Sequence, residues 1–189
     1  MKVLLFDGSN VQDSFFSSLN DLICDIVKKK KCEIETLNIK NMNIGYCLGC
    51  FGCWTKTPGI CLINDEGREI PKKMVNSDLL IYLNPITFGG YSSTLKKALD
   101  RCIPVLLPFF RKVNGEVHHK MRYDKYPDIL AIGVINKRND ILEKIFRNLI
   151  NRNSINMNAN INVVRIVEYN EDFIKIERDI SDVFDEVIK

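Results

Sequence analysis

Residues 78–84 read DLLIYLN and lead directly into Pro85. The run from Leu79 to Leu83 is apolar at every position and is bounded by polar residues on both sides. A short apolar run without alternation is typical of a strand buried on both faces, as in a parallel sheet covered by helices. The proline then ends the strand, because it has no N–H to donate to a neighbouring strand.

Four further segments are rich in apolar residues and are also expected to be strands, and stretches with helical periodicity separate them. The expected strands are residues 2–6, 33–39, 78–84, 129–135 and 161–167. The expected helix N-caps are Asp13 or Ser14, Asp65, Ser92 or Ser93, and Asp140. Residues 104–127 are rich in aromatic residues and are expected to be irregular. Alternating strands and helices predict the α/β class, here a five-stranded parallel sheet in a single domain of residues 1–189.

Composition excludes several classes of protein. Hydrophobic residues make up 46% of the chain and charged residues 27%, and no apolar run approaches the roughly 18 residues of a membrane span. The start, MKVLLFDGSN, is too short an apolar stretch for a signal peptide, so we expect a cytoplasmic protein. Lys28–Lys31 is the longest basic block and holds no aromatic residue, which favours a solvated helix end over nucleic-acid binding.

Four cysteines lie close together, in the spacing C-x2-C-x2-C-x7-C: Cys47, Cys50, Cys53 and Cys61. Clustered cysteines in a reducing compartment indicate metal binding or redox chemistry. A [4Fe–4S] cluster needs four thiolates and suits these short spacings, whereas structural zinc sites usually have two separated C-x-x-C pairs. Three interpretations stay open at this point: a [4Fe–4S] cluster, free or disulfide-prone thiols, and zinc.

Two loops at the expected carboxyl edge of the sheet are candidate ligand sites, because ligands of such sheets bind at that edge. The first, GSNVQDS at residues 8–14, surrounds a helix N-terminus that favours a phosphate, although simple helix capping explains its serines equally well. The second follows residues 78–84. Pro85 fixes its turn, and Gly89 and Gly90 allow a flat ligand to approach the backbone.

Residues 85–101, PITFGGYSSTLKKALDR, resemble the P-x-x-x-G-x-x-S-x-x-L-K-x-x-x-D-R segment of the NAD(P)H-dependent FMN reductases of flavodoxin-like fold. The cysteine segment, residues 47–61, together with Asp65 resembles the C-x-G-C-x-x-C…G-x-C-x-x-x-D stretch of that family, best known from the iron–sulfur flavoproteins. The two motifs in tandem are specific. The resemblance implies a flavodoxin-like three-layer sandwich with strand order 2-1-3-4-5.

The resemblance also implies FMN as cofactor and assigns residues to it. The FMN phosphate would be held by Ser9, Ser14 and Ser17. The isoalloxazine ring would be contacted by Pro85, Ile86, Thr87, Phe88 and Gly89, with Asn136 near the flavin edge. The four cysteines would hold the cluster and form an electron relay beside the flavin. Lys96, Asp100 and Arg101 match the helix signature of the family, but helix capping and surface or interface ion pairs explain them more simply.

The first loop departs from the family pattern. It lacks the usual G-S-P-R and Ser/Thr-rich run, and has Asn10 and Val11 followed by Phe15 and Phe16. The loss of the arginine and a hydroxyl weakens the expected hold on the phosphate.

The expected function is an FMN-dependent oxidoreductase with NAD(P)H or a ferredoxin-type donor and a small-molecule acceptor. No side chain is assigned a catalytic role, because the flavin carries the chemistry. The alternatives are a flavodoxin-type electron carrier, disfavoured by the net charge of +3, and a flavin-free binding scaffold.

The aromatic segment predicts self-association. Pro108, Phe109, Phe110, Tyr123 and Tyr126 form a stretch too apolar to lie exposed on a monomer, so we expect a homodimer or homotetramer with this segment at the interface, near the flavin. The adjacent His118 and His119 have no partner at metal-binding spacing, and we expect them at the surface or at a subunit contact.

Overall fold

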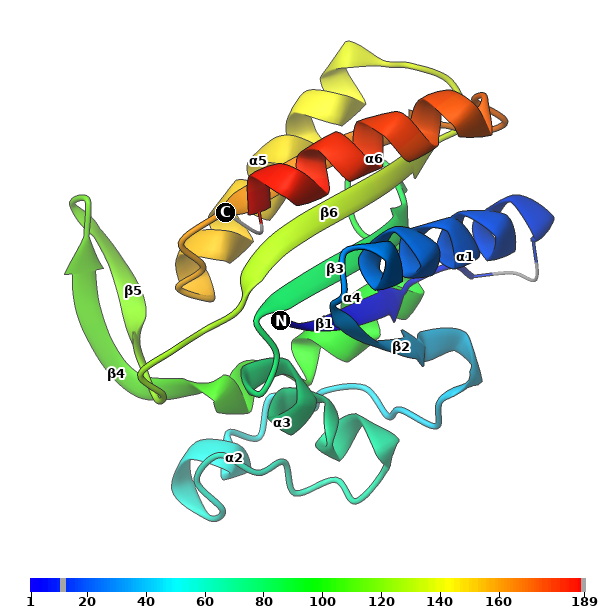
Figure 1. Cartoon of the computed structure of the whole chain (residues 1–189). Coiled ribbons are helices and arrows are strands. Elements are labelled where there is room, and N and C mark those ends of the chain that lie inside the picture. Colours follow the sequence, from blue (N-terminus) through cyan, green and yellow to red (C-terminus); the bar gives the residue numbers. More distant parts are fainter. Residues whose placement is uncertain (11–12, 188–189) are drawn as a thin grey trace.

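The computed structural model describes residues 1–10 and 13–187. At its centre lies a five-stranded parallel sheet with the order β2-β1-β3-β6-β7 (Figure 1). The strands are β1 (Lys2–Asp7), β2 (Glu33–Asn38), β3 (Leu79–Pro85), β6 (Asp128–Ile135) and β7 (Asn162–Glu168). Each expected strand is therefore found within one residue of its predicted bounds. The central strand β3 is buried from Leu79 to Asn84, as its continuous apolar run predicts.

Helices cover both faces of the sheet (Figure 1). One apolar core joins the sheet to α1 (Ser14–Lys29) and α6 (Phe173–Val187). The other core joins it to α3 (Ile70–Val75), α4 (Ser93–Asp100) and α5 (Asp140–Asn156). Short helical turns complete the chain: α2 (Gly52–Thr55), η1 (Ile39–Asn41), η2 (Glu66–Arg68) and η3 (Ile103–Val105). This is the predicted flavodoxin-like sandwich, and its strands follow the order 2-1-3-4-5 when those of the sheet alone are numbered along the chain.

The expectation that residues 104–127 are irregular was wrong for residues 106–121. They form an antiparallel hairpin of β4 (Leu106–Val113) and β5 (Glu116–Met121). Its turn is made by Asn114 and Gly115, with φ angles of 49° and 85°. Asn-Gly is the most favoured pair for such a turn, because both residues adopt positive φ at little cost. The hairpin projects from the left of the molecule in Figure 1.

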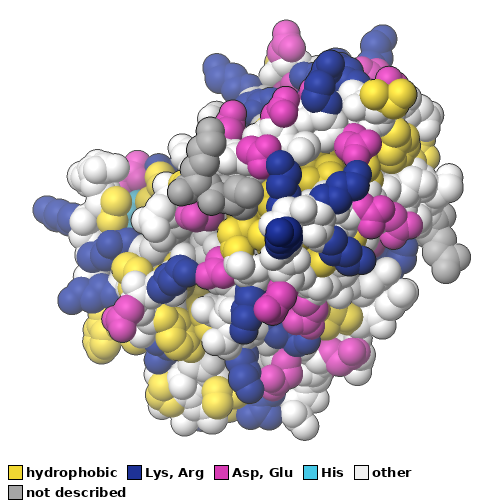
Figure 2. All heavy atoms as spheres, viewed as in Figure 1, with side chains coloured by type: hydrophobic (Ala, Val, Ile, Leu, Met, Phe, Trp, Pro, Cys, Tyr) yellow, Lys and Arg dark blue, Asp and Glu magenta, His cyan; other side chains and the backbone are white. Residues whose placement is uncertain are grey.

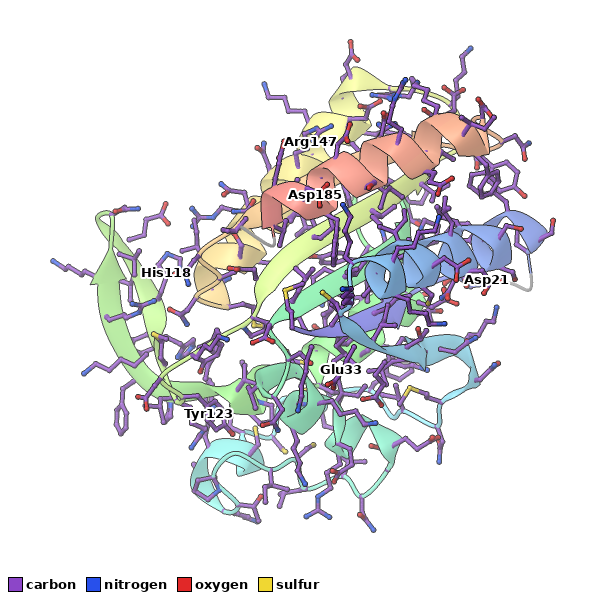
Figure 3. All side chains as sticks on the ribbon, viewed as in Figure 1. Asp21, Glu33, His118, Tyr123, Arg147 and Asp185 are labelled. Carbon is purple, nitrogen blue, oxygen red and sulfur yellow. The ribbon has the colours of Figure 1, made fainter. Side chains whose placement is uncertain are left out.

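Local details correct other expectations. Asn139, rather than Asp140, caps α5, and its side-chain oxygen accepts from the N–H groups of Ile141 and Leu142 at 3.1 Å each. The helix that follows Ser92 ends at Asp100. His118 was expected at the surface or at a subunit contact, but it is only 5% exposed. It is buried because the hairpin packs against α5 there (Figure 3). Its Nδ1 lies 2.8 Å from Oδ1 of Asn156.

The two edges of the sheet carry different elements. The loops after β1, β3 and β6 lie at the carboxyl edge, toward the right of Figure 1, whereas α2 and the hairpin lie toward the opposite edge. Within residues 1–10 and 13–187, none of the helices is long and apolar enough to cross a lipid bilayer.

Candidate functional site

The ring loop, residues 85–90, leaves the carboxyl end of β3 as a tight two-residue turn. Thr87 and Gly90 bond each other in both directions, N to O at 3.1 Å and 2.8 Å. Phe88 and Gly89 form the turn with φ of 51° and 78°. An aromatic residue at positive φ is strained, by roughly 1–3 kcal/mol. Phe88 is nevertheless 93% exposed, so no packing within the chain explains its place there.

Buried polar groups hold the ring loop to the sheet. Asn84 accepts from the Ser92 N–H at 2.8 Å, and its Nδ2 donates to the Pro85 carbonyl at 2.9 Å. Ser92 caps α4 as predicted, since its Oγ accepts from the Leu95 N–H at 3.0 Å and donates to the Gly8 carbonyl at 2.6 Å. Ser92 thus joins the first loop, the ring loop and α4. Sequence reasoning missed Asn84, and its only sequence signal is a polar residue that ends an apolar strand.

The first loop contributes both a hydroxyl group, from Ser9, and a carboxylate, from Asp13. Ser9 is 1% exposed, and its Oγ has no hydrogen-bond partner among the described residues. The N-terminus of α1 is capped by Asp13, which accepts from the Phe15 N–H at 2.8 Å and from the Tyr169 hydroxyl at 2.7 Å. These bonds, the Tyr169 bond first, lower the pKa of Asp13, so a carboxylate lies where a phosphate would meet the helix.

The remaining predicted FMN residues lie at the same edge. Ser14 and Ser17 are exposed on the first turn of α1, and the Ser17 Oγ donates to the Asp13 carbonyl at 3.0 Å. Val11 lies outside the described residues. Asn136 is exposed just after β6, next to the ring loop, because the Ile86 N–H donates to the Val134 carbonyl at 2.8 Å.

The residues at this edge suit the ring of a flavin and its phosphate to different degrees. The ring loop offers an exposed aromatic side chain, and Ser9 offers an unused hydroxyl. At the phosphate end the carboxylate of Asp13 takes up helix N–H groups and repels an anion. The residues present therefore fit the ring better than they fit the phosphate.

The four cysteines of the cysteine segment line one cavity of about 290 Å³, the cysteine cavity. Cys47 and Cys50 are exposed, Cys61 is half-buried and Cys53 is buried, and all four are free thiols. Burial, followed by the charge of Cys61, raises the pKa of Cys53. Among the described residues no three His, Cys, Asp or Glu side chains are grouped so as to hold a metal ion.

A buried ion pair lies beside the cysteine cavity, and one of its members, Arg101, lines the cavity. The Arg101 guanidinium, with a side chain 0% exposed, donates to both oxygens of Asp65 at 2.8 Å each. Arg101 also donates to the Gly45 carbonyl at 2.8 Å, but its buried Nε has no hydrogen-bond partner within residues 1–10 and 13–187. The simpler expectation of a surface ion pair was therefore wrong for Arg101. Asp65 makes no capping bond to η2 and binds Arg101 instead.

The cysteine cavity and the ring loop lie at opposite ends of α4. Ser92 adjoins the ring loop at the N-terminus of the helix, whereas Asp100, Arg101 and Ile103 line the cysteine cavity beyond its C-terminus. Eight residues of helix span about 12 Å. The cysteine segment starts from the carboxyl edge after β2 but runs back to the other edge (Figure 1). The expected position of the cysteines beside the flavin stays a prediction, and within one chain the cysteine cavity and the ring loop lie at the two ends of α4.

Aromatic contacts join the cysteine segment to the hairpin. Trp54 donates from Nε1 to the Leu106 carbonyl at 2.9 Å, and it stacks on Phe51 and packs against His119. Phe109 and Phe110 remain 63% and 61% exposed, and Figure 2 shows hydrophobic side chains gathered at the lower left, over this region. Tyr126 is 4% exposed within its own chain, which corrects its expected place at an interface.

Comparison with known proteins assigns the family. The sequence model of the NADPH-dependent FMN reductase family matches residues 1–121, and the chain belongs to this family. An iron-sulfur flavoprotein of Methanocaldococcus jannaschii is 33% identical over 119 residues, which are 62% of this chain and 61% of that protein. One of Archaeoglobus fulgidus is 31% identical over 102 residues, which are 53% of this chain and 48% of that protein. The match thus spans less than two thirds of these relatives.

Solved structures share the fold. An NAD(P)H:quinone oxidoreductase from Methanothermobacter marburgensis superposes with a TM-score of 0.68 at 11% identity, covering 96% of this chain and 91% of that one. An FMN-dependent NADH-azoreductase from Bacillus anthracis, solved in complex with FMN, gives 0.69 at 12% identity, covering 100% and 99%. At such low identity these similarities establish the flavodoxin-like fold.

Proposed function

We propose that the chain is an FMN-dependent oxidoreductase that works as one domain. The flavin ring would bind at Pro85, Ile86, Thr87, Phe88 and Gly89, with Asn136 at its edge. The phosphate would bind at Ser9, with Ser14 and Ser17 at the mouth of the first loop. Membership in the NADPH-dependent FMN reductase family and similarity to iron-sulfur flavoproteins support this assignment.

One observation carries the proposal: Phe88 is held at positive φ and is almost fully exposed at the carboxyl edge. Strained backbone persists where function requires it, and an aromatic ring at this place offers a flat surface to a flat ligand. Gly89 supports the turn, because a Cβ there would lie 2.8 Å from Cγ2 of Ile145 on α5. The loop is therefore fixed from behind, with its aromatic side chain free.

The chemistry belongs to the cofactor. Bound FMN would supply hydride transfer from NAD(P)H, or single-electron exchange with a ferredoxin-type donor, and reduction of a small-molecule acceptor. The role of this chain would be to orient the ring and to keep the loop rigid through Asn84 and Ser92. No side chain is assigned as a catalytic acid, base or nucleophile.

The test is an FMN titration of the purified chain followed by quenching of flavin fluorescence. We expect Phe88→Ala to weaken FMN binding about tenfold, which corresponds to about 1.4 kcal/mol. Phe109→Ala is the matched control, because it removes another exposed phenyl group far from the ring loop. Equal affinity of the two variants would contradict the proposed ring site. Bleaching of bound flavin by NADH or NADPH would distinguish a reductase from a flavodoxin-type carrier.

The phosphate end supports a second candidate, a flavin-free scaffold. Asp13 is fixed at the helix N-terminus by Tyr169 and would oppose an anion. Asp13→Asn should therefore strengthen FMN binding, since it removes a negative charge while keeping a capping side chain. The scaffold would be favoured if the wild-type protein is colourless after anaerobic purification and if neither wild type nor Asp13→Asn binds added FMN.

We also propose a [4Fe–4S] cluster held by Cys47, Cys50, Cys53 and Cys61. The four thiols line one cavity but do not converge on a point. The short C-x2-C-x2-C spacing suits a cluster better than zinc, whose structural sites usually have two separated C-x-x-C pairs. The buried guanidinium of Arg101 lines the same cavity and offers an unpaired Nε–H to an anionic group.

The cluster is tested by anaerobic reconstitution with iron and sulfide, read by visible absorption and iron content. Cys50→Ser should lose the iron while FMN binding persists, because the cysteine cavity and the ring loop are separate. Cys24→Ser is the matched control, since Cys24 is a half-buried thiol on α1. Iron content that is unchanged in Cys50→Ser would exclude this residue as a ligand.

Self-association belongs to the same proposal. The exposed Phe109, Phe110 and Val117 of the hairpin support a homodimer or homotetramer formed through this face. Sedimentation of wild type against Phe109→Asp tests it, and a monomer at all concentrations for both proteins would contradict it. Free thiols at all seven cysteines support a reducing, cytoplasmic location.

A further inference from the structure

A second cavity, distinct from the ring loop and the cysteine cavity, lies between α4, α5 and the hairpin. We call it the tyrosine cavity. Its volume is about 340 Å³, which falls within the range of small-molecule sites, roughly 300–1,000 Å³. Tyr82 of β3 and Tyr91 contribute phenol groups, while Leu99, Cys102, Leu106 and Met157 give it apolar walls.

Tyr82 is 1% exposed at the centre of the sheet, and its hydroxyl makes no hydrogen bond among the described residues. Buried tyrosine hydroxyls usually find a partner, because leaving one unpaired costs stability. Tyr126, the other strongly buried tyrosine, follows the rule, since its hydroxyl donates to the Val105 carbonyl and accepts from the Arg122 N–H.

Tyr91 adds a second unused donor. Its oxygen accepts from Nδ2 of Asn153 at 2.9 Å, and its own proton has no acceptor among the described residues. Burial raises the pKa of Tyr91 to about 12 and that of Tyr82 well above its usual value, so both hydroxyls keep their protons at neutral pH. The cavity thus presents two O–H donors that have no acceptor within hydrogen-bonding distance among the described residues, while Asp100, His119, Asn153 and Asn156 also line it.

The charges at the cavity wall cancel. Lys96 and Asp100 form an ion pair with each other one helical turn apart on α4. Burial raises the pKa of Cys102 to about 12, so its thiol stays neutral and apolar in character. A ligand of this cavity therefore needs an acceptor oxygen on an apolar, uncharged body.

We propose that the tyrosine cavity binds a small, uncharged, planar aromatic carbonyl compound whose oxygen accepts from the hydroxyl of Tyr82. The aromatic rings around the cavity meet edge to face, Tyr82 with Tyr91 at 6.3 Å, which suits an aromatic body. The site is separate from the proposed flavin site and does not depend on a bound flavin. Tyr91 directly follows the ring loop, and Asp100 and Ile103 also line the cysteine cavity, so the ligand would lie between the two.

The probe is 1-indanone, and indane is its matched hydrocarbon without the oxygen. Binding to the flavin-free full-length chain is followed by amide chemical shifts in NMR titrations. We expect saturable binding of 1-indanone, with shifts centred on Cys102 and Met157, and at least about tenfold weaker binding of indane, the value of one good hydrogen bond.

Variants make the test specific. Tyr82→Phe should lower the affinity for 1-indanone about tenfold and leave indane unchanged, because it removes the donor alone. Its fold should persist, since that hydroxyl makes no hydrogen bond to any residue that the structure describes. Tyr123→Phe is the matched control on a tyrosine outside the cavity, and Met157→Trp should fill the cavity and abolish binding of both probes.

Three results would overturn the proposal: no saturable binding of 1-indanone, equal affinity for indane, or an unchanged 1-indanone affinity in Tyr82→Phe. Water filling the cavity is then the better account of the unpaired hydroxyl. The measurements use flavin-free protein, so these results do not bear on the proposed flavin site. In the same way, a failure to bind FMN would not contradict the proposal for the tyrosine cavity.

Discussion

Removal of the Asp65 carboxylate should destabilise the fold severely. Its partner Arg101 has a side chain 0% exposed and is held by two bonds of 2.8 Å, and Asp65 also accepts from the Gly45 N–H at 2.7 Å. Asp65→Ala therefore leaves a buried guanidinium without its counter-charge, which typically costs about 3–5 kcal/mol. That is a large part of the roughly 5–15 kcal/mol that holds a domain folded.

Urea unfolding followed by circular dichroism measures this loss. The matched control is Lys96→Ala, which breaks the neighbouring but exposed Lys96–Asp100 pair on the same helix and should cost about 0.5 kcal/mol or less. The double variant Asp65→Ala/Arg101→Met should be less destabilised than Asp65→Ala alone, because it removes the unpaired charge. The reasoning is refuted if Asp65→Ala costs no more than Lys96→Ala, or if the double variant is the least stable of the three.

Three further outcomes follow from single contacts. Tyr126→Phe should cost about 1–3 kcal/mol, whereas Tyr82→Phe stays within about 0.5 kcal/mol of wild type, both measured by urea unfolding. Phe88→Asn should raise the free energy of unfolding by about 1 kcal/mol, because asparagine tolerates positive φ, while FMN affinity falls. The Arg101 hydrogen bond lowers the pKa of Asp65 below its ordinary 3.8, so its contribution is full above pH 3.8 and is lost as pH falls through the folded-state pKa. Stability measured from pH 5 to pH 2 should thus fall less steeply in Asp65→Asn.

The centre of the sheet could be predicted from the sequence because β1, β3 and β6 are runs of mostly apolar residues, whereas the edge strand β2 has only Ile34 and Leu37 as apolar positions. β3 is the clearest case, since every residue from Leu79 to Leu83 is buried. The hairpin lacked that signal, because β4 mixes exposed aromatic and basic residues and has a bulge between Leu106 and Phe110. The sequence does contain the signal for its turn, because Asn114-Gly115 is a favoured pair in two-residue hairpin turns. That pair predicts a strand on each side of it.

The parts of the site that sequence reasoning missed depend on contacts between distant residues. Arg101 and Asp65 are 36 positions apart, and no local pattern pairs them. A weak signal existed, because Arg101 is followed by Cys102 and Ile103 and so lies at an apolar helix end. No sequence pattern indicates that the Tyr82 hydroxyl is unpaired. The apolar run predicts that the tyrosine is buried, but it does not predict which groups lie near its hydroxyl.

The distance between the two proposed cofactor sites follows from the direction of α4. A helix that connects strands of a parallel sheet runs back across it, so its N-terminus meets the carboxyl edge and its C-terminus meets the other. Ser92 therefore holds the ring loop while Arg101 holds the cysteine cavity, about 12 Å of helix apart. The cysteine segment begins at the carboxyl edge after β2, yet the Asp65–Arg101 pair draws it to the far end of α4. A buried ion pair with Arg101 holds Asp65, just after the cysteine segment, beyond the C-terminus of α4, at the end of the helix opposite the ring loop.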